Sequence, residues 1–417
     1  MIKTKLILVD GITGSGKSTT THLLYRHMLR NGVKVKWIYE VESDHPLFEL
    51  IKTKDETDIE HSERAFKEIP EKWVKFVEKI KDDEYVYIVE SYLFQDVLMF
   101  PHFMNDIDRD RMKQYSHSIL KIAEELNPVL IHYYQNDVAK ALRGNWRNRG
   151  REWTDEFIKS DEKTLYCKNR KIKGRKASIQ LWSDFTKFTL ELFDEYKFRK
   201  IQFENSDHDY NSYMDNILNF LKLKKYPEIE LKYQGHKFDG DYIGTGMKFK
   251  IYKKGSYFYL DTFWPGLRLL QVSNNEFEIL GFPISLKIYR YKKETRLKIT
   301  ESKTLFKAGT ALKKYEQYIL SEKEVDQYCG EWYCEAEKLK RKIFRKKGKM
   351  YYYWYDKDVK CELIPVAENK FIKLAGIENM ITFKKVKGKW QYSVWDKGYK
   401  SNAVFVKKKD SDEDKEK

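Results

Sequence analysis

The first half of the chain alternates between short apolar runs and longer segments in which apolar residues recur at helical spacing. The apolar runs have the length of strands, and Leu6–Val9 is the first of them. Strands that alternate with helices predict a parallel, doubly wound α/β sheet. We therefore expect one α/β domain over residues 1–225, with a boundary at Lys224–Pro227. The predicted strands cover residues 6–9, 33–39, 85–89, 129–134 and 200–203, and the predicted helices cover 59–81, 108–126, 137–147 and 177–196, with one more from residue 19 and one ending near 223.

Beyond Pro227 the pattern changes to aromatic and β-branched runs separated by short turns such as Lys254–Gly255. This pattern is typical of a mostly antiparallel, all-β region. Three segments recur at nearly equal offsets, which predicts two copies of one β module over residues 228–325 and 326–409, followed by a disordered acidic tail at 410–417. The matched segments are Tyr233 and Gly235 with Tyr328 and Gly330 (offset 95), Gly255 to Tyr259 with Gly348 to Tyr352 (offset 93), and Asn275 to Phe277 with Asn369 to Phe371 (offset 94).

A phosphate-binding motif lies between the first predicted strand and the first predicted helix. Residues 11–18 read GITGSGKS and match GxxxxGK[ST]. Glycines let backbone N–H groups approach phosphates closely, and the helix N-terminus adds positive potential. We expect Lys17 to reach the β- and γ-phosphates of ATP and the Ser18 hydroxyl to bind Mg²⁺. The predicted nucleotide-binding residues are Gly11, Thr13, Gly14, Ser15, Gly16, Lys17, Ser18 and Thr19.

Carboxylates end the first three predicted strands. Asp10 follows the first, Glu40 and Glu42 follow the second, and Glu90 follows the third. Parallel sheets bind ligands at the carboxyl ends of their strands, so these side chains should converge near the phosphate loop. We expect Glu90 to organise Mg²⁺ or to position water, and either Glu40 or Glu42 to be the general base for an acceptor hydroxyl. Which of these two is the base stays open.

An arginine cluster follows the fourth predicted strand, at Arg143, Arg147, Arg149 and Arg151. Phosphoryl transfer needs cations on the equatorial oxygens of the transferred group, and a mobile arginine-bearing lid supplies them while excluding water. We therefore expect Arg143, Arg147 and Arg149 to act in catalysis.

With these features, residues 1–225 resemble the thymidylate kinase and deoxynucleoside kinase branch of the P-loop kinases. The resemblance rests on residues 6–20, the acid at Glu40, the Glu90–Ser91 strand end and the arginine-rich segment. It implies a P-loop NTPase fold with a five-stranded parallel sheet, and it gives the phosphate loop, the acids and the arginines the roles stated above. Those families place an acid–Arg pair after the third strand, whereas Ser91 follows Glu90 here. Gln95 and Arg111 are candidates for reading an acceptor base.

Composition narrows the classes of partner. The net charge is +16 with a pI near 9.2, and much of the excess is Lys spread over the β region, as on solvated strand faces. A mean hydropathy of −0.72 and the lack of a long apolar stretch predict a cytoplasmic protein with no membrane partner. The four cysteines lack metal-type spacing and are expected to be free thiols.

The leading hypothesis is an ATP- and Mg²⁺-dependent phosphotransferase, with a nucleoside triphosphate and an unidentified small molecule, such as a nucleoside or nucleotide, as its ligands. Two alternatives stay open. One is an NTP-hydrolysing regulator that acts through the β modules, and the other is a nucleic-acid end kinase that uses the basic surface. The acceptor, the choice between ATP and GTP, the role of the β repeat and homo-oligomerisation also stay open.

Overall fold

The computed structural model describes residues 3–42, 44–47, 52–227, 238–244, 246–304, 306–316, 318–375, 377–396 and 399–407. The chain forms two compact units. The first comprises Met1–Glu230 together with the short segments Glu278–Ile284 and Lys303–Leu305, and the second comprises Leu231–Phe277, Ser285–Ser302 and Phe306–Lys417.

The first unit is built on a five-stranded parallel sheet in the order β2-β3-β1-β4-β5, as predicted. The strand β1 is central and buried along its whole length, which suits its unbroken apolar sequence. The strands are β1 (Leu6–Gly11), β2 (Val35–Ile38), β3 (Val86–Glu90), β4 (Val129–Tyr134) and β5 (Arg199–Glu204).

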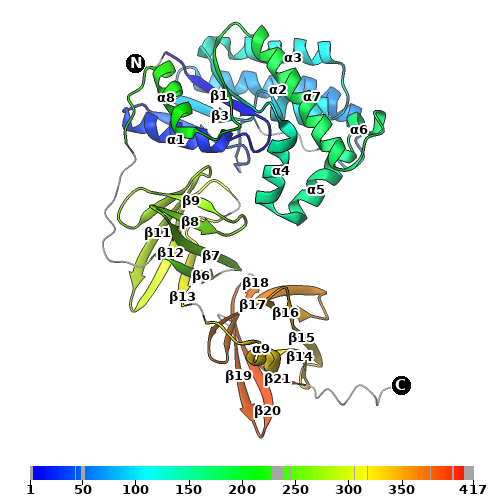
Figure 1. Cartoon of the computed structure of the whole chain (residues 1–417), viewed down its shortest axis with the longest axis vertical. Helices are drawn as coiled ribbons and strands as arrows, with labels where there is room; N and C mark the ends of the chain where they lie inside the picture. The colour runs from blue at the N-terminus through cyan, green and yellow to red at the C-terminus, as the bar shows by residue number, and fades with distance from the viewer. Residues whose placement is uncertain are drawn as a thin grey trace. The chain divides into compact units, whose positions relative to one another are not determined.

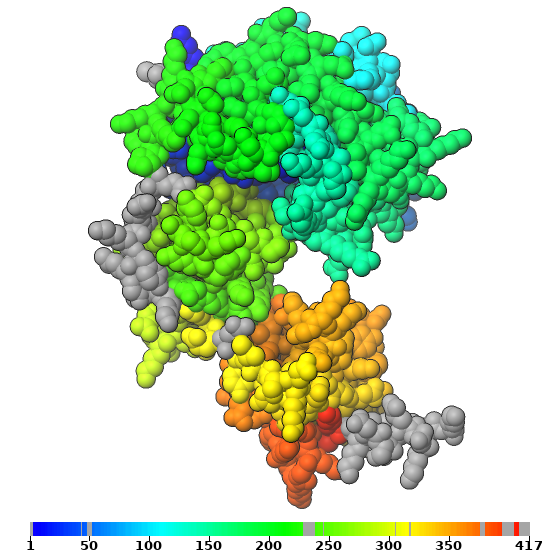
Figure 2. Space-filling model, in the orientation of Figure 1, coloured from blue at the N-terminus to red at the C-terminus, as the bar shows by residue number. Residues whose placement is uncertain are grey.

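Helices cover both faces of this sheet (Figure 1). Ile7 and Val9 of β1 pack with α1 (Lys17–Arg30) and α8 (Tyr210–Leu221), whereas Leu6 and Leu8 pack with the helices of the opposite face. These are α2 (Asp58–Ile80), α3 (Arg109–Ala123) and α7 (Gly174–Glu195). Green and cyan segments from the later part of this unit form most of its visible face, and little of the blue N-terminal segment shows there (Figure 2). The alternation of side chains along each strand thus supplies two separate apolar layers.

Several helices were not predicted from the pattern. The segment after β3 forms a buried π-helix, η1 (Gln95–Phe103). The predicted helix 137–147 is α4 (Val138–Arg149), and Gly150, with φ of +88°, separates it from α5 (Arg151–Glu162). A short α6 (Leu165–Asn169) precedes α7, and a 3₁₀ turn, η2 (Glu124–Leu126), follows α3. The arginine-rich segment is therefore a helical hairpin.

The second unit contains two closed, antiparallel, eight-stranded barrels, which confirms the all-β prediction. Each is an up-and-down meander that has no free edge. The first barrel has β6 (Gly240–Gly244), β7 (Met247–Lys254), β8 (Tyr257–Asp261), β9 (Leu267–Gln271), β10 (Glu276–Ile279), β11 (Ile284–Tyr291), β12 (Glu294–Ser302) and β13 (Ala311–Tyr315). After α9 (Glu322–Tyr328), the second has β14 (Gly330–Cys334), β15 (Leu339–Lys346), β16 (Lys349–Trp354), β17 (Val359–Ala367), β18 (Lys370–Ala375), β19 (Ile377–Val386), β20 (Lys389–Asp396) and β21 (Tyr399–Lys407).

The barrels are two copies of one module, and their hairpins define how the copies align. The β7–β8 hairpin closes on the pair Lys254–Tyr257, and the β15–β16 hairpin closes on the pair Lys346–Lys349. The offset here is therefore 92 residues, and the predicted offset of 93 is wrong by one. This single residue matters because it exchanges the inward and outward faces of a strand.

The remaining offsets also follow from the strands. Asn275 and Asn369 each accept a backbone hydrogen bond at 2.8 Å, from Ile288 and Phe383, which supports the predicted offset of 94 at β10 and β18. The turns before β12 and β20 align with an offset of 95 residues.

The start of the repeat is different from the prediction. The counterpart of Gly330, the first residue of β14, is Gly240, the first residue of β6. Both have positive φ, +132° and +141°. The residues predicted for this match, Tyr233 and Gly235, lie outside the described residues, as does the predicted tail 410–417.

Two smaller expectations can also be compared with the structure. All four cysteines are free. Within the described residues, no helix combines the length and the apolar character that crossing a membrane would require.

Candidate functional site

The predicted phosphate-binding loop joins β1 to α1 and is packed tightly on both sides. Gly11 and Gly16 have φ of +152° and +99°. A Cβ on Gly11 would lie 2.3 Å from the carbonyl oxygen of Tyr133, and one on Gly16 would lie 2.4 Å from the hydroxyl of Tyr210. Only glycine fits these two positions, because of both the backbone conformation and the space.

The end of β5 holds the other side of the loop. Asn205, which is fully buried, donates a hydrogen bond from its side-chain amide to the carbonyl of Ser15. Gln135 donates to the carbonyl of Asn205 at 2.9 Å, and Thr20 donates to the hydroxyl of Tyr133 at 2.7 Å. The sequence gives no sign of this role, because nothing local to Asn205 shows that it reaches the loop.

Lys17 connects the loop to the segment after β3. Its buried ammonium donates to the carbonyls of Gly11 (3.0 Å) and Ile12 (3.2 Å) and to Oε1 of Gln95 (3.0 Å). Gln95 in turn donates from Nε2 to Oε1 of Glu40 at 2.8 Å. The predicted phosphate-binding lysine and one predicted base are therefore joined through one amide.

Glu40 and Glu42 are separated by the fold. The second carboxylate oxygen of Glu40 accepts from the Ser91 hydroxyl at 2.8 Å, so Glu40 faces the phosphate loop. Glu42 instead accepts from the backbone N–H of Tyr39 and pairs with Lys303, both at 3.1 Å. Of the two candidates, only Glu40 belongs to the hydrogen-bond network of Lys17.

Ser18 and Glu90 form the candidate metal site. The Ser18 hydroxyl donates to Oε1 of the fully buried Glu90, whose Oε2 has no hydrogen-bond partner among the described residues. Burial and the charge of Glu40 raise the pKa of Glu90 to about 8, against the opposing effects of Ser18 and Lys17. A buried carboxylate with an unpartnered oxygen beside a hydroxyl fits Mg²⁺, which is bound through one or two protein oxygens together with phosphate oxygens.

The carboxylate of Asp10 is held by backbone N–H groups on two segments. Its carboxylate accepts hydrogen bonds from the backbone N–H groups of Gly11 (2.7 Å), Leu93 (2.9 Å) and Phe94 (2.8 Å). Burial raises its pKa, and the charge of Lys17 and these hydrogen bonds act in the opposite direction. Asp10 thus holds the start of the segment that carries Gln95.

The arginines of the α4–α5 hairpin are not equivalent. Arg143 and Arg147 are exposed on α4, and Arg151 pairs with Asp155 at 3.4 Å. Arg149 is half-buried, with its guanidinium 4.5 Å from the centre of the Trp153 ring. Burial lowers the pKa of Arg149, and the charge of Glu40 opposes this shift, so Arg149 lies within electrostatic reach of the Lys17 network.

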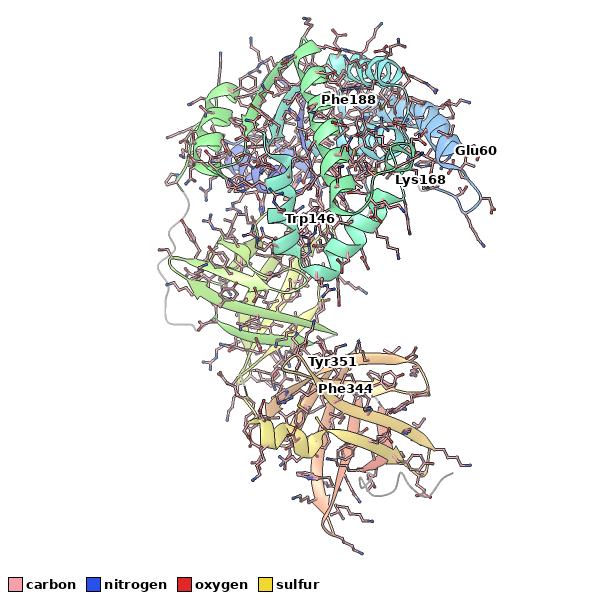
Figure 3. The ribbon with its side chains drawn as sticks, turned by 45° about the vertical axis from the view of Figure 1, so that its right-hand side comes forward. Glu60, Trp146, Lys168, Phe188, Phe344 and Tyr351 are labelled. Carbon is pink, nitrogen blue, oxygen red and sulfur yellow. The ribbon has the colours of Figure 1, made fainter. Side chains whose placement is uncertain are left out.

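One further residue of α4 reaches the phosphate loop. The side-chain amide of Asn145 lies 3.0 Å from the place that a Cβ on Gly14 would take. Its Nδ2 is buried and has no hydrogen-bond partner among the described residues. Asn145 stands one position before Trp146, which Figure 3 labels on α4. The arginines of this helix stand out in the sequence, whereas this amide carries no local signal.

The outer side of α1 contacts the segment Glu278–Ile284, which belongs to the first unit. The backbone N–H of Gly281 donates to Nδ1 of the buried His22 at 3.1 Å, so Nε2 of His22 carries the proton and donates to Glu278 at 2.9 Å. Arg26 donates to both oxygens of Glu278 at 2.7 Å. A Cβ on Gly281 would lie 3.6 Å from that of Ser18, so this segment reaches the metal side of the loop.

Comparisons with known proteins find limited structural similarity and no match in sequence. No protein-family model matches the sequence, and no curated protein matches it. Among solved structures, the chain is similar to the YorR protein from Bacillus subtilis, which was solved in complex with phosphorylated GDP. The two share 11% sequence identity, the match covers 52% of this chain and 95% of that chain, and the TM-score is 0.28. It is also similar to thymidylate kinase from Ehrlichia chaffeensis, with 13% identity, 52% and 98% covered, and a TM-score of 0.33. The fold assignment rests on the strand order and the loop described above.

Proposed function

We propose that residues 1–225 form an ATP- and Mg²⁺-dependent phosphotransferase that acts on a hydroxyl or phosphate group of a small molecule, with the modules 228–325 and 326–409 as accessory domains. The observation that carries this proposal is the continuous chain of contacts from Lys17 through Gln95 to Glu40. It joins a phosphate-binding cation to a carboxylate at the carboxyl edge of a parallel sheet, which is where such sheets bind ligands.

The donor half of the site is the loop 11–19. Its backbone N–H groups would hold the α- and β-phosphates, and Lys17 would move from the loop carbonyls to the β- and γ-phosphates. Ser18 and Glu90 would hold Mg²⁺, which when bound neutralises charge on the phosphate oxygens. Asn145 would add an amide donor over the loop.

The acceptor half would centre on Glu40. An acceptor hydroxyl next to this carboxylate would give its proton to Glu40 as its oxygen attacks the γ-phosphorus, and ADP would leave. Ser91 and Gln95 each hold one oxygen of Glu40 and so orient the carboxylate. Arg149, and Arg143 and Arg147 on closure of the α4–α5 hairpin, would stabilise the transferred group and exclude water.

The test is acceptor-stimulated turnover. Purified protein with Mg²⁺ and ATP should form ADP faster when the right acceptor from a panel of nucleosides, nucleotides and other metabolites is added, and the product should carry the phosphate. Lys17→Ala should lose this activity. A protein that binds Mg²⁺–ATP but shows no stimulation by any class of acceptor would contradict the proposal.

A second candidate function is a nucleotide-dependent regulator. The observation in its favour is the contact of Glu278 and Gly281 with α1. Glu278 lies in β10 of the first barrel, and Gly281 lies between β10 and β11, close to Ser18. Steady ATP hydrolysis without any acceptor, slowed or accelerated by Glu278→Gln, would favour this function over transfer.

A further inference from the structure

The two barrels carry the same kinds of side chain on the outward face of one matched hairpin. In the first barrel, Tyr252 of β7 and Tyr259 of β8 are cross-strand neighbours, and their stacked rings have centres 5.8 Å apart. At the offset of 92 residues their counterparts are Phe344 of β15 and Tyr351 of β16, which are also cross-strand neighbours with stacked rings, 5.5 Å apart. Figure 3 labels this second pair. All four rings are partly exposed and alternate with buried residues along their strands, so each copy presents one stacked aromatic pair outward.

Lysines flank the aromatic pair at the same positions in both copies. Lys250 and Lys342 come two residues before the ring on β7 and β15, and Lys254 and Lys346 come two residues after it. Residues two apart on a strand point to the same face, so these lysines share the face of the aromatic pair. All four are exposed, and within the part of the chain that the structure describes no ammonium of the four forms an ion pair or a hydrogen bond.

The inward positions of the barrels are less alike than these outward ones. Three buried apolar residues of the first barrel are matched by polar or charged residues in the second, namely Phe249 by Arg341, Leu260 by Tyr352 and Ile279 by Lys373. Packing constrains an inward position, whereas a solvated outward position accepts most side chains at little cost in stability. Both copies keep the rings and the lysines outside although the interior has changed, which points to a requirement at the surface.

Stability explains the rings but not the lysines. A cross-strand aromatic pair stabilises a hairpin, whereas like charges directly opposite each other destabilise it. Lys346 lies directly opposite Lys349 in the register of β15 and β16. The hairpin therefore keeps a cation that its own stability does not favour, and a negatively charged partner would offset this repulsion.

The second copy extends this surface by one ring and one lysine. By strand register, Tyr353 of β16 lies between Lys342 of β15 and Lys360 of β17, and all three side chains point outward. The counterpart of Tyr353 in the first copy is Asp261, so the first copy is less basic here. Residues 326–409 also contain about twice as many Lys and Arg residues as Asp and Glu residues, whereas the whole chain has 80 and 64. The second barrel is therefore the copy better suited to a polyanion.

We propose that this outward face of β15–β17 binds single-stranded nucleic acid. The face is made of Lys342, Phe344, Lys346, Tyr351, Tyr353 and Lys360, and we call it the aromatic–lysine face. Bases stack on its rings, and its lysines neutralise phosphates of the strand. The matched face of β7–β8 is a weaker site of the same kind. This function is independent of the phosphotransferase proposed above.

The combination of rings and cations selects this partner among polyanions. In a duplex the bases are stacked on one another, so no base face is available to the rings, whereas a single strand offers its bases. An acidic protein or an anionic membrane would pair with the lysines alone. The aromatic–lysine face should therefore prefer a single strand over a duplex of equal length.

Fluorescence anisotropy with the full chain and labelled oligonucleotides tests this preference. Single strands of dT and rU, each of about 20 nucleotides, are compared with a duplex of the same length at one ionic strength. We expect saturable binding of at least one single strand, tighter than that of the duplex, with a Kd that increases with salt. No binding of either strand, equal or tighter binding of the duplex, or binding only to vesicles of anionic phospholipid would overturn the proposal.

Variants separate stacking from charge. Tyr351→Ala should weaken binding of the single strand about 5- to 100-fold and leave its salt dependence unchanged, and Tyr351→Phe should retain the binding. Tyr353→Ala leaves the stacked pair intact and gives the same test if Tyr351→Ala unfolds the hairpin. Lys342→Gln should weaken binding and make the slope of log K against log salt shallower by about 0.7.

Lys384→Gln is the matched control, because this lysine is exposed on β19, outside the aromatic–lysine face, and should leave binding and its salt slope unchanged. Equal losses in Lys342→Gln and Lys384→Gln would assign the binding to net charge. Full binding by both tyrosine-to-alanine variants would exclude stacking. Either result would contradict the proposal.

Discussion

At the scale of single residues, the site depends on which of two neighbouring carboxylates faces the phosphate loop. Glu40 is held by Ser91 and Gln95, whereas Glu42 pairs with Lys303. The two acids are two positions apart and chemically alike, so the sequence left the base undecided. Hydrogen-bond partners from β3 and η1 separate them.

Substitution of the two acids tests this difference. Glu40→Gln should lower kcat of acceptor phosphorylation by about 10²- to 10⁴-fold, the usual contribution of a general base, with little change in ATP affinity. Glu42→Gln is the matched control and should change kcat only a few-fold, because its partners lie outside the network of Lys17. Steady-state kinetics with the identified acceptor measures both. Equal losses in the two variants would contradict the assignment.

The raised pKa of Glu90, about 8, predicts a pH dependence of metal binding. Mg²⁺ needs the ionised carboxylate, so below this pKa the metal must displace a proton. Affinity for Mg²⁺–ATP should therefore increase with pH, by up to about tenfold per unit below pH 8, and level off above it. Calorimetric titrations from pH 6 to 9 measure this slope, and Glu90→Gln should bind weakly with no such slope. Equal affinity at pH 6 and pH 8 in the wild type would exclude Glu90 as the ligand.

At the scale of elements, the phosphate-loop helix is held from two sides that are distant in the sequence. Asn205 and Tyr210 from β5 and α8 hold the loop, and the segment Glu278–Ile284 holds the outer side of α1. The partners His22 and Glu278 are 256 residues apart. No periodicity connects such positions, so only the structure shows that they meet.

Glu278→Gln should destabilise the first unit by about 1–3 kcal/mol, because it leaves Arg26 and His22 with a weaker, uncharged partner in a mostly buried position. Chemical denaturation, monitored by hydrogen exchange of α1, measures this change in the free energy of unfolding. In a double-mutant cycle with Arg26→Met the two losses should not add, because they remove one shared interaction. Additive losses would show that the contact with Arg26 contributes nothing.

Elements with regular periodicity were predicted well, and irregular ones were not. The strand β4 has the predicted bounds, and α2 differs from its prediction by one residue at each end. The π-helix η1 was missed because Val97–Phe100 is uniformly apolar and so carries no period. The helix α5 was missed because charged residues dominate its sequence, and Trp153, Phe157 and Ile158 give only a weak apolar period.

At the scale of the whole molecule, the chain forms two compact units, and we expect a nucleotide to stabilise the first unit and not the second. The proposed function requires that Mg²⁺–ATP bind the folded first unit, and a concentration of 100 times its Kd should then stabilise that unit by about 2.7 kcal/mol. The barrels β6–β13 and β14–β21 should keep their stability, and Lys17→Ala should abolish the shift. Thermal denaturation monitored by hydrogen exchange separates the two units. An unchanged shift in Lys17→Ala would place the nucleotide elsewhere.

By itself, the sequence predicted the parallel sheet, the glycine-rich loop after its first strand and the duplicated β module, because each shows as a local pattern or as a local pattern that recurs along the chain. The tertiary structure alone decided which acid joins Lys17, that Asn145 and Asn205 reach the loop, and that the second barrel has a charged interior. It also shifted the repeat by one residue, which decides whether Arg341 points inward. Such features depend on packing between segments tens to hundreds of residues apart, where neither spacing nor propensity specifies the partner.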